Sequence, residues 1–246
     1  RESKKYQLRG EILSFIPVDK NVEIMLVTIT NTGRMAQTVT PTAAIPLYGR
    51  SADNIRDHRH VTSLLHRIET TDTGVLVTPT LSFDERGHQV NHMTYYCVGW
   101  SGNGEKPVDF YPTAEDFVGE GGNFERPYAI VKNAEGVKAG TKIEGLEAVG
   151  GLHFSEITLE PEEECSYLIF TGITEDIQEI RNLSKTYTTR EKVLEELEKT
   201  KAYWQEKVNV AYHTGDSDFN QFMHWVSFQP ILRRIYGCSF LPHHDY

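Results

Sequence analysis

The densest group of side chains that could do chemistry lies between positions 50 and 67. Its charged and histidine members are Arg50, Asp53, Arg56, Asp57, His58, Arg59, His60, His66 and Arg67. Arginine presents forked donors that suit carboxylates, phosphates and paired sugar hydroxyls, and a neutral histidine offers one donor and one acceptor. The segment is either a polar loop whose charges pair with each other and with water, or a loop that reaches a ligand. Composition alone favours the first interpretation.

A second group of histidines stands in the terminal stretch GCSFLPHHDY, which contains His243, His244 and Asp245. Adjacent histidines cannot easily aim at one ion, whereas His58 and His60 would point the same way on a strand. Zinc needs three or four convergent ligands, and the HExxH spacing is absent from the sequence. We therefore predict no metal site.

Other motifs give little support for catalysis by this chain. The glycine-rich stretch at 119–123 lacks the Lys-Ser/Thr of a phosphate-binding loop, and no GxSxG is present. Trp100 could stack on a sugar ring or fill the core, and the sequence leaves both interpretations open. The 35 acidic residues cannot be sorted into a catalytic pair without geometry.

Charge and composition exclude two classes of partner. The net charge of −10 argues against nucleic acid, and no apolar run reaches the roughly 20 residues of a membrane span. Three widely spaced cysteines without a CxxC pair indicate reduced thiols, so we expect a cytoplasmic protein. The charged first residues lack a signal segment, and the missing Met indicates a piece of a longer protein.

The first part of the chain reads as a series of strands. Ranges 22–31 and 37–49 predict a long hairpin, and 60–69 and 74–83 predict two strands joined by a turn. Further strands are predicted at 92–100 and, around a Pro-Glu turn, within 150–174. Long strands at this spacing favour a mainly β fold, a β-sandwich, over residues 1–174.

Helical patterns follow the strands. Residues 188–208 carry apolar side chains at helical spacing within a predicted helical linker over 175–213. A more apolar helix follows within 214–246, with Asp216 or Ser217 as its expected cap and Phe219 and Phe222 on its apolar side. Little chain remains for this second helix to pack against, so we expect the isolated chain to self-associate or aggregate.

Three stretches of this sequence resemble glycoside hydrolase family 94, the disaccharide and oligosaccharide phosphorylases. The segment HWVSFQPILRRIYGCSFLPHHDY is similar to the family's W-x-x-x-Q-x-x-x-x-R-like helix, through Trp225, Gln229, Arg233 and Arg234. The stretch DFVGEGGNFERPYAI is similar to its F-x-G-x-x-G-x-x-x-x-P pattern, through Phe117, Gly119, Gly122 and Pro127. The polar segment at 49–68 resembles the branch that includes 1,2-β-oligoglucan phosphorylases and cyclic β-1,2-glucan synthases.

The resemblance implies a large two-sheet β-supersandwich similar to galactose mutarotase, followed by linker helices and the start of an (α/α)6 barrel. It implies reversible phosphorolysis with inversion, in which inorganic phosphate is a co-substrate and one Asp is the general acid. No cofactor is implied. The acid and the phosphate ligands are expected after Tyr246, so no catalytic residue is predicted here, and this fragment alone is expected to be inactive.

The resemblance also implies partners and contact residues. Sandwich loops of the family help to wall the active site, often across a dimer interface. We therefore take these residues as candidate contacts of substrate or partner: Arg56, Asp57, Arg59, His60, His243, His244 and Asp245. The expected partners are the remainder of the catalytic barrel, an oligosaccharide of the β-glucan type and a second copy bound through the sandwich.

Two alternatives to a phosphorylase fragment stay open. One is a non-catalytic carbohydrate-binding or interaction module, which would bind oligosaccharides tightly on its own, whereas a phosphorylase fragment should bind them weakly or not at all. The other is a mutarotase-like sugar epimerase, which needs a His and a Glu converging on one sheet face. His88, His92 and His153 are its candidates, and no spacing selects among them.

Overall fold

The computed structural model describes residues 1–49, 59–84, 87–232, 234–235 and 238–239. It divides into two compact units, Arg1–Glu196 and Leu197–Tyr246. The first unit is mainly β, as the sequence predicts.

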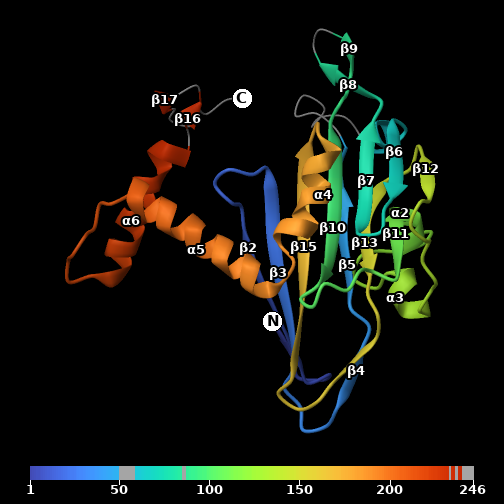
Figure 1. Cartoon of the computed structure of the whole chain (residues 1–246), viewed down its shortest axis with the longest axis horizontal. Helices are drawn as coiled ribbons and strands as arrows, with labels where there is room; N and C mark the ends of the chain where they lie inside the picture. Colours follow the sequence, from blue (N-terminus) through green and yellow to red (C-terminus); the bar gives the residue numbers. More distant parts are fainter. Residues whose placement is uncertain (50–58, 85–86, 233, 236–237, 240–246) are drawn as a thin grey trace. The chain divides into compact units, whose positions relative to one another are not determined.

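One antiparallel sheet of eight strands, here called the main sheet, organises the first unit (Figure 1). Its strands, in spatial order, are β1 (Glu2–Ser3), β2 (Leu8–Phe15), β3 (Val22–Asn31), β15 (Glu164–Thr174), β10 (Thr94–Ser101), β7 (Gly74–Pro79), β6 (His66–Thr70) and β12 (Lys142–Glu144). β6 and β7 form the hairpin predicted around the turn at 71–73. β15 and β3 pair over nine residues, which places the chain's late strand beside an early one.

A second sheet of three strands packs on one face of the main sheet. Its order is β11 (Asp109–Thr113), β13 (Ala148–His153) and β5 (Thr42–Leu47). Smaller pairs complete the strands: β4 (Gln37–Val39) with β14 (Ile157–Leu159), β8 (Leu81–Asp84) with β9 (Gly87–Val90), and β16 (Arg234–Ile235) with β17 (Cys238–Ser239). The two larger sheets approach so closely that a Cβ at Gly150 of β13 would collide with Cys97 of β10.

Within the described residues, five helices begin in the first unit. They are α1 (Arg59–Ser63), α2 (Ala114–Val118), α3 (Tyr128–Lys132), α4 (Ile177–Thr186) and α5 (Arg190–Lys207). The side chain of Asp176 caps α4 by accepting a hydrogen bond from the Gln178 amide at 2.8 Å. α4 lies against the main sheet, opposite the second sheet.

The main sheet is apolar on both faces because its central strands alternate between two cores. Leu168 and Phe170 of β15 point into a core closed by α4 and the start of α5, where Leu183 also lies. Tyr167, which precedes Leu168, and Ile169, which lies between Leu168 and Phe170, point into the core shared with the second sheet. Successive side chains of a strand point to opposite faces of the sheet, so a strand that is apolar at every position needs other elements packed on both faces.

The predicted hairpin over 22–31 and 37–49 is wrong. β3 pairs with β2 and β15 in the main sheet, whereas β5 pairs with β13 in the second sheet. The connection between them is fixed by the buried side chain of Asn31. Its Nδ2 donates to the carbonyls of Met35 at 2.8 Å and Leu159 at 2.9 Å, and its Oδ1 accepts from the Gly33 amide. These bonds turn the chain out of one sheet and into the other.

The strand predicted over 60–69 is only partly correct, because its first residues form α1 and the strand begins at His66. A hydrogen bond of 3.1 Å from the Leu65 amide to the Thr62 carbonyl ends the helical turn. Thr62 and Ser63 are buried while Val61 is exposed, a pattern of one helical turn against the sandwich.

The second unit contains the end of α5 and α6 (Ser217–Leu232). Asp216 caps α6 as predicted, since its Oδ1 accepts from the amides of Asp218 and Phe219, each at 3.0 Å. Within this unit the ring of Trp204 lies 5.7 Å from that of Phe228. None of the described residues of α6 is buried, and Phe222 and Trp225 are among its exposed apolar side chains.

Removing one ring from the core beneath α4 tests the two-sided packing. Phe170 is fully buried and stacks on Trp100 at 4.7 Å between ring centroids. We expect Phe170→Ala to lower the free energy of unfolding by about 3–5 kcal/mol, because a large cavity replaces the ring. Urea denaturation measures the change. Ile12→Ala, at an exposed position of β2, is the control and should change stability by about 0.5 kcal/mol or less. Equal effects of the two substitutions would contradict this packing.

Candidate functional site

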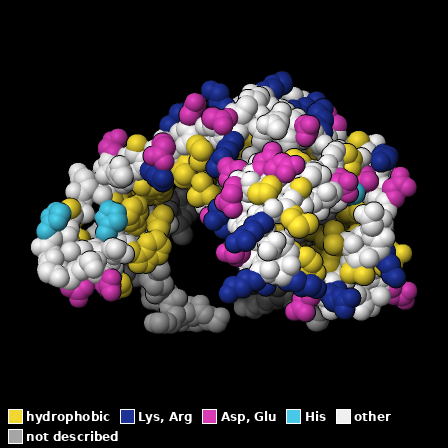
Figure 2. All heavy atoms as spheres, turned by 90° about the horizontal axis from the view of Figure 1, so that it is seen from below, with side chains coloured by type: hydrophobic (Ala, Val, Ile, Leu, Met, Phe, Trp, Pro, Cys, Tyr) yellow, Lys and Arg dark blue, Asp and Glu magenta, His cyan; other side chains and the backbone are white. Residues whose placement is uncertain are grey.

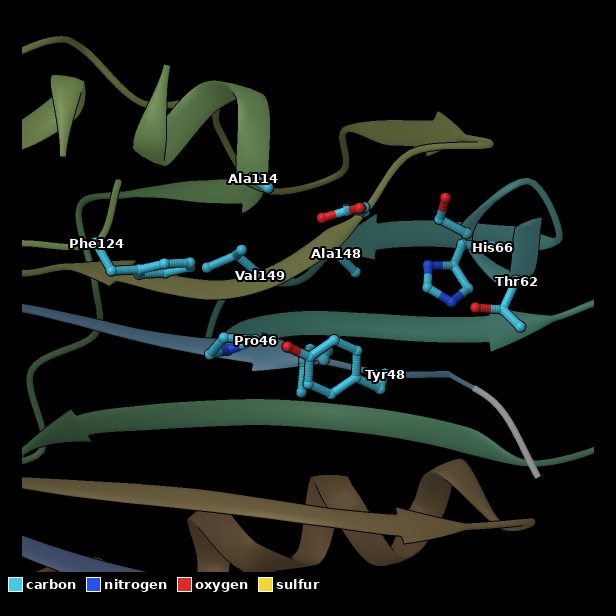
Figure 3. A pocket seen from close by; sticks show the side chains of 11 residues that line it. Pro46, Tyr48, Thr62, His66, Ala114, Phe124, Ala148 and Val149 are labelled. Carbon is cyan, nitrogen blue, oxygen red and sulfur yellow. The ribbon is translucent and has the colours of Figure 1, made fainter. Parts of the chain in front are cut away.

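A small cavity lies at the base of the polar segment on which the sequence-based candidates fall. We call it the loop-base pocket, and Figure 3 shows it with His66 and Thr62 at one end and Phe124 at the other. Tyr48 follows β5 and Thr62 lies in α1, so the pocket sits where the chain enters and leaves residues 50–58. Its volume is about 30 Å³, enough for one to a few water molecules and too small for a sugar ring.

Strand pairing brings most of the walls together. In the second sheet Leu47 faces Ala148 and Pro46 faces Val149, and the pocket is lined by both pairs. Glu147, just before β13, adds a carboxylate to the lining. The pocket is therefore a product of the β5–β13 register and does not depend on local sequence alone.

Phe124 reaches the pocket from the turn between α2 and α3. Phe117 anchors that turn in the core, with its ring 5.8 Å from Tyr111 and 5.9 Å from Phe124. Gly119 ends α2, and Pro127 precedes α3 as its N-cap. The F-x-G-x-x-G-x-x-x-x-P stretch thus positions an aromatic side chain at the edge of the cavity.

His66 is the polar residue most deeply buried in this wall, with 3% of its surface exposed. Its Nδ1 lies 3.1 Å from the carbonyl oxygen of Leu146, which can only accept a hydrogen bond, so Nδ1 carries the proton. Burial lowers the pKa of His66, and the backbone of Leu146 and Gly49 and the charge of Glu147 oppose the shift only in part. Nε2 of the neutral ring lies on the other side, beside the backbone of Gly49.

The rim of the pocket is aromatic. Tyr48 is 51% exposed and Phe124 is 49% exposed, although large aromatic side chains usually bury most of their surface. Aromatic faces of this kind can pack on the apolar face of a sugar ring, while the carboxylate of Glu147 offers acceptors to hydroxyl groups or to water. The arrangement can hold and orient a neutral ligand at the rim.

Most of the sequence-based candidates cannot be compared with this geometry. Arg56, Asp57, His243, His244 and Asp245 lie outside the described residues. Of Arg59 and His60 the structure describes only the backbone, at the start of α1. The contact role of all seven residues remains a prediction.

Trp100 and the three candidate histidines His88, His92 and His153 lie within the described residues. Trp100 is a packing residue, because it is buried and its Nε1 donates to the Tyr187 carbonyl at 2.9 Å. His88 lies on β9, His92 lies in the connection to β10, and His153 ends β13. His153 Nδ1 lies 2.6 Å from Asp109 Oδ1, so its acidic neighbour is an Asp and the three histidines occupy different elements.

Sequence reasoning missed Tyr48, Phe124 and Glu147. Phe124 could have been found, because it lies inside the quoted glycine-rich motif. Tyr48 and Glu147 come together only through the β5–β13 register, which no local pattern reveals. Within the described ranges, no cluster of three His, Cys, Asp or Glu side chains could hold a metal ion.

The comparison with known protein families shows the class to which this fold belongs. A family model for the supersandwich domain of glycosyl hydrolase 94 matches residues 2–190. The chain belongs to the glycosyl hydrolase 94 family. A search of the curated proteins finds no match. No helix within the described part of the chain has the length and hydrophobicity of a membrane span.

Protonation of His66 should weaken the fold at acidic pH. Because burial lowers its pKa in the folded state, the unfolded chain takes up the proton more readily. The contribution of His66 to the free energy of unfolding is then fully present above its ordinary pKa of 6.5, and it is lost as the pH falls below that value. We expect His66→Gln, which cannot be protonated, to lose less stability than the unsubstituted chain between about pH 8 and 5.5. Urea midpoints at both pH values measure this, and parallel losses would contradict it.

Proposed function

We propose that this chain is the N-terminal sandwich and linker of an inverting glycoside phosphorylase that acts on β-glucan-type oligosaccharides. The observation that carries the proposal is the family match over residues 2–190, which takes in the main sheet, the second sheet and α4. In this proposal inorganic phosphate is the co-substrate, and an (α/α)6 barrel joined to α6 supplies the general acid and the phosphate ligands.

One protein carboxylate suffices for such a reaction. An oxygen of inorganic phosphate attacks the anomeric carbon, the glycosidic carbon–oxygen bond breaks, and the acid protonates the departing sugar oxygen. Phosphate takes the place of the activated water of an inverting hydrolase, so no second carboxylate is needed as a base. Direct displacement inverts the configuration and converts a β-linked glucosyl unit into α-glucose 1-phosphate.

The apolar character of α6 supports a missing partner of helical type. Phe219, Phe222, Trp225 and Leu232 are all exposed, although such side chains normally find a buried environment. Trp225 and Gln229 lie on α6 at the positions of the family's helix motif, and Arg233 lies outside the described residues. We propose that this helix packs as the first helix of the barrel.

The loop-base pocket suggests how the sandwich contributes. We propose that Tyr48 and Phe124 form part of a wall beside the oligosaccharide, and that a homodimer through the sandwich domain completes it. The same aromatic rim also favours the second candidate function, a non-catalytic carbohydrate-binding module. We propose a cytoplasmic location as well, which the free thiols of Cys97 and Cys165 support.

The phosphorolysis assay tests the proposal. A polypeptide that joins this chain to its catalytic barrel should release α-glucose 1-phosphate from at least one β-linked glucobiose or longer β-glucan in the presence of inorganic phosphate. The 246-residue chain alone should release none. Absence of release from every β-glucan would contradict the substrate class, and tight oligosaccharide binding by the chain alone would favour the binding module.

Two matched substitutions localise the contribution of the sandwich. In the joined polypeptide Phe124→Ala should raise KM for the oligosaccharide by roughly 2- to 10-fold, the value of one aromatic contact. Val131→Ala on α3, which is 52% exposed and outside the pocket lining, is the control and should leave KM unchanged.

A further inference from the structure

An apolar groove lies beside the open edge of the second sheet. We call it the edge groove. Its floor is formed by β2, β3 and β15, its wall by β5 and the residue before it, and Phe154, just after β13, completes the lining. Its volume is about 280 Å³, roughly that of nine water molecules in the liquid. Every described residue of the lining is uncharged, so the groove can take several apolar side chains.

The floor of the edge groove loses its cover from β15 towards β2. Tyr167 of β15, Val27 of β3 and Ile12 of β2 lie directly opposite one another in the main sheet. Tyr167 is 6% exposed, Val27 is half-buried and Ile12 is 68% exposed. The second sheet therefore ends above β15, and the apolar face of the main sheet continues beyond it.

The wall of the edge groove is the edge of a sheet. β5 pairs with β13 on one side, and among the described strands none pairs with its other side. An edge strand presents N–H and C=O groups that have no partner in the sheet, and another extended chain can pair with them. Pro46 has no N–H, so such pairing would extend along residues 42–45 of β5.

The edge and the floor together define the shape of the occupant. A strand added to β5 would lie about 4.8 Å from it and send every second side chain to the floor. Met25 and Val27 of β3 would receive those side chains. A helix or a small apolar molecule could cover the floor, but neither offers a row of backbone partners to β5. An extended peptide satisfies both surfaces at once.

Charge indicates which extended peptide fits. Because side chains alternate along a strand, Glu23 points to the same face as Met25, and it accepts a hydrogen bond from Ser14 on that face. Of the side chains that β2 and β3 turn to this face, Glu23 is the charged one. The whole chain carries a net charge of −10. A strand with basic residues at its ends therefore complements the groove and its surroundings.

A second copy of this chain does not meet these requirements. Two β5 strands that pair antiparallel are related by a two-fold axis perpendicular to the sheet. Because β5 lies against β10, the strands β15, β3 and β2 of both copies would extend into one layer and collide. Parallel pairing would turn the apolar side chains of the second β5 away from the floor. Two copies with a net charge of −10 would also repel each other.

We propose that the edge groove binds an extended segment of a partner protein as an additional strand beside β5. The segment has apolar side chains at alternate positions and basic residues at its ends. This site is separate from the loop-base pocket, because the two linings share no residue. It does not depend on the proposed phosphorolysis, because its whole lining belongs to the first unit.

Fluorescence anisotropy of a labelled peptide with the full chain tests the site. The probe is the peptide KVTVTVTVK, in which valine alternates with threonine between two lysines. We expect it to bind with a dissociation constant of about 100 μM or tighter. Two control peptides should each bind at least about tenfold more weakly: KVVTTTVVK, which has the same composition without the alternation, and KVTVPVTVK, which lacks a central N–H.

Two neighbouring substitutions on β2 localise the binding. Ile12→Lys places a charge on the floor of the groove, whereas Leu13→Lys places the same charge on the opposite face of the strand. We expect Ile12→Lys to weaken binding of KVTVTVTVK by about tenfold and Leu13→Lys to change it by less than about twofold. Both side chains are exposed in the folded chain, and urea midpoints check that both variants remain folded.

Hydrogen exchange measures the pairing with β5 itself. The bound probe should slow exchange of backbone amides within residues 42–45 and leave the amides of α3 unchanged. Equal affinity for KVVTTTVVK, unchanged exchange within 42–45 or absence of saturable binding would overturn the proposal. So would a sedimentation experiment in which the unsubstituted chain is a dimer and Ile12→Lys a monomer, because a second copy would then occupy the groove.

Discussion

The main sheet must be covered on both faces, and the rest of the first unit follows from that constraint. β15 sends Phe170 to one side and Ile169 to the other, and both side chains are buried. At about 25 cal/mol per Å² of apolar surface removed from water, two such faces are the main source of stability for a domain of this size. The second sheet covers one face, and α4 with the first turns of α5 covers the other.

Both pockets lie where a cover ends. The loop-base pocket lies at the end of the second sheet, where the β5–β13 pairing stops and the chain runs into residues 50–58. A second cavity, whose lining includes Lys20, Val22, Tyr96 and Tyr187, lies at the end of α4, where Tyr187 turns the chain toward α5. On the face shown in Figure 2, basic and acidic side chains are interspersed. A mixed surface of this kind suits neutral ligands better than polyanions.

Local patterns predicted much of the fold. The alternation in 22–31 and 164–174, the turn before Gly74 and the cap at Asp216 are encoded within a few residues of each feature, so the sequence reveals them. The false hairpin after β3 failed for a nonlocal reason: the partner of Asn31 that fixes the sheet crossing is the carbonyl of Leu159, far along the chain. The resemblance to glycosyl hydrolase 94, carried by spaced motifs, was confirmed by the family match.

The candidate sites were harder to predict than the fold. Sequence reasoning concentrated on the charged segment at 50–60 because charge density is visible in one dimension. Glu147 meets His66 only through strand pairing, and Lys20 meets Tyr187 only because α4 folds back over β3. The deep burial of polar side chains, which singles out His66 and Tyr187, is a property of three-dimensional packing.

The most direct test of this two-sided architecture is the cooperativity of unfolding of two shortened polypeptides. Residues 1–174 end at the predicted sandwich boundary, whereas residues 1–196 keep Ile180, Leu183, Tyr187 and Val193 over the main sheet. We expect 1–196 to unfold in one cooperative urea transition with native near-ultraviolet circular dichroism. We expect 1–174, with one apolar face uncovered, to lack that transition and to aggregate. Cooperative unfolding of 1–174 at the same midpoint would contradict the claim that α4 and the start of α5 are part of the sandwich fold.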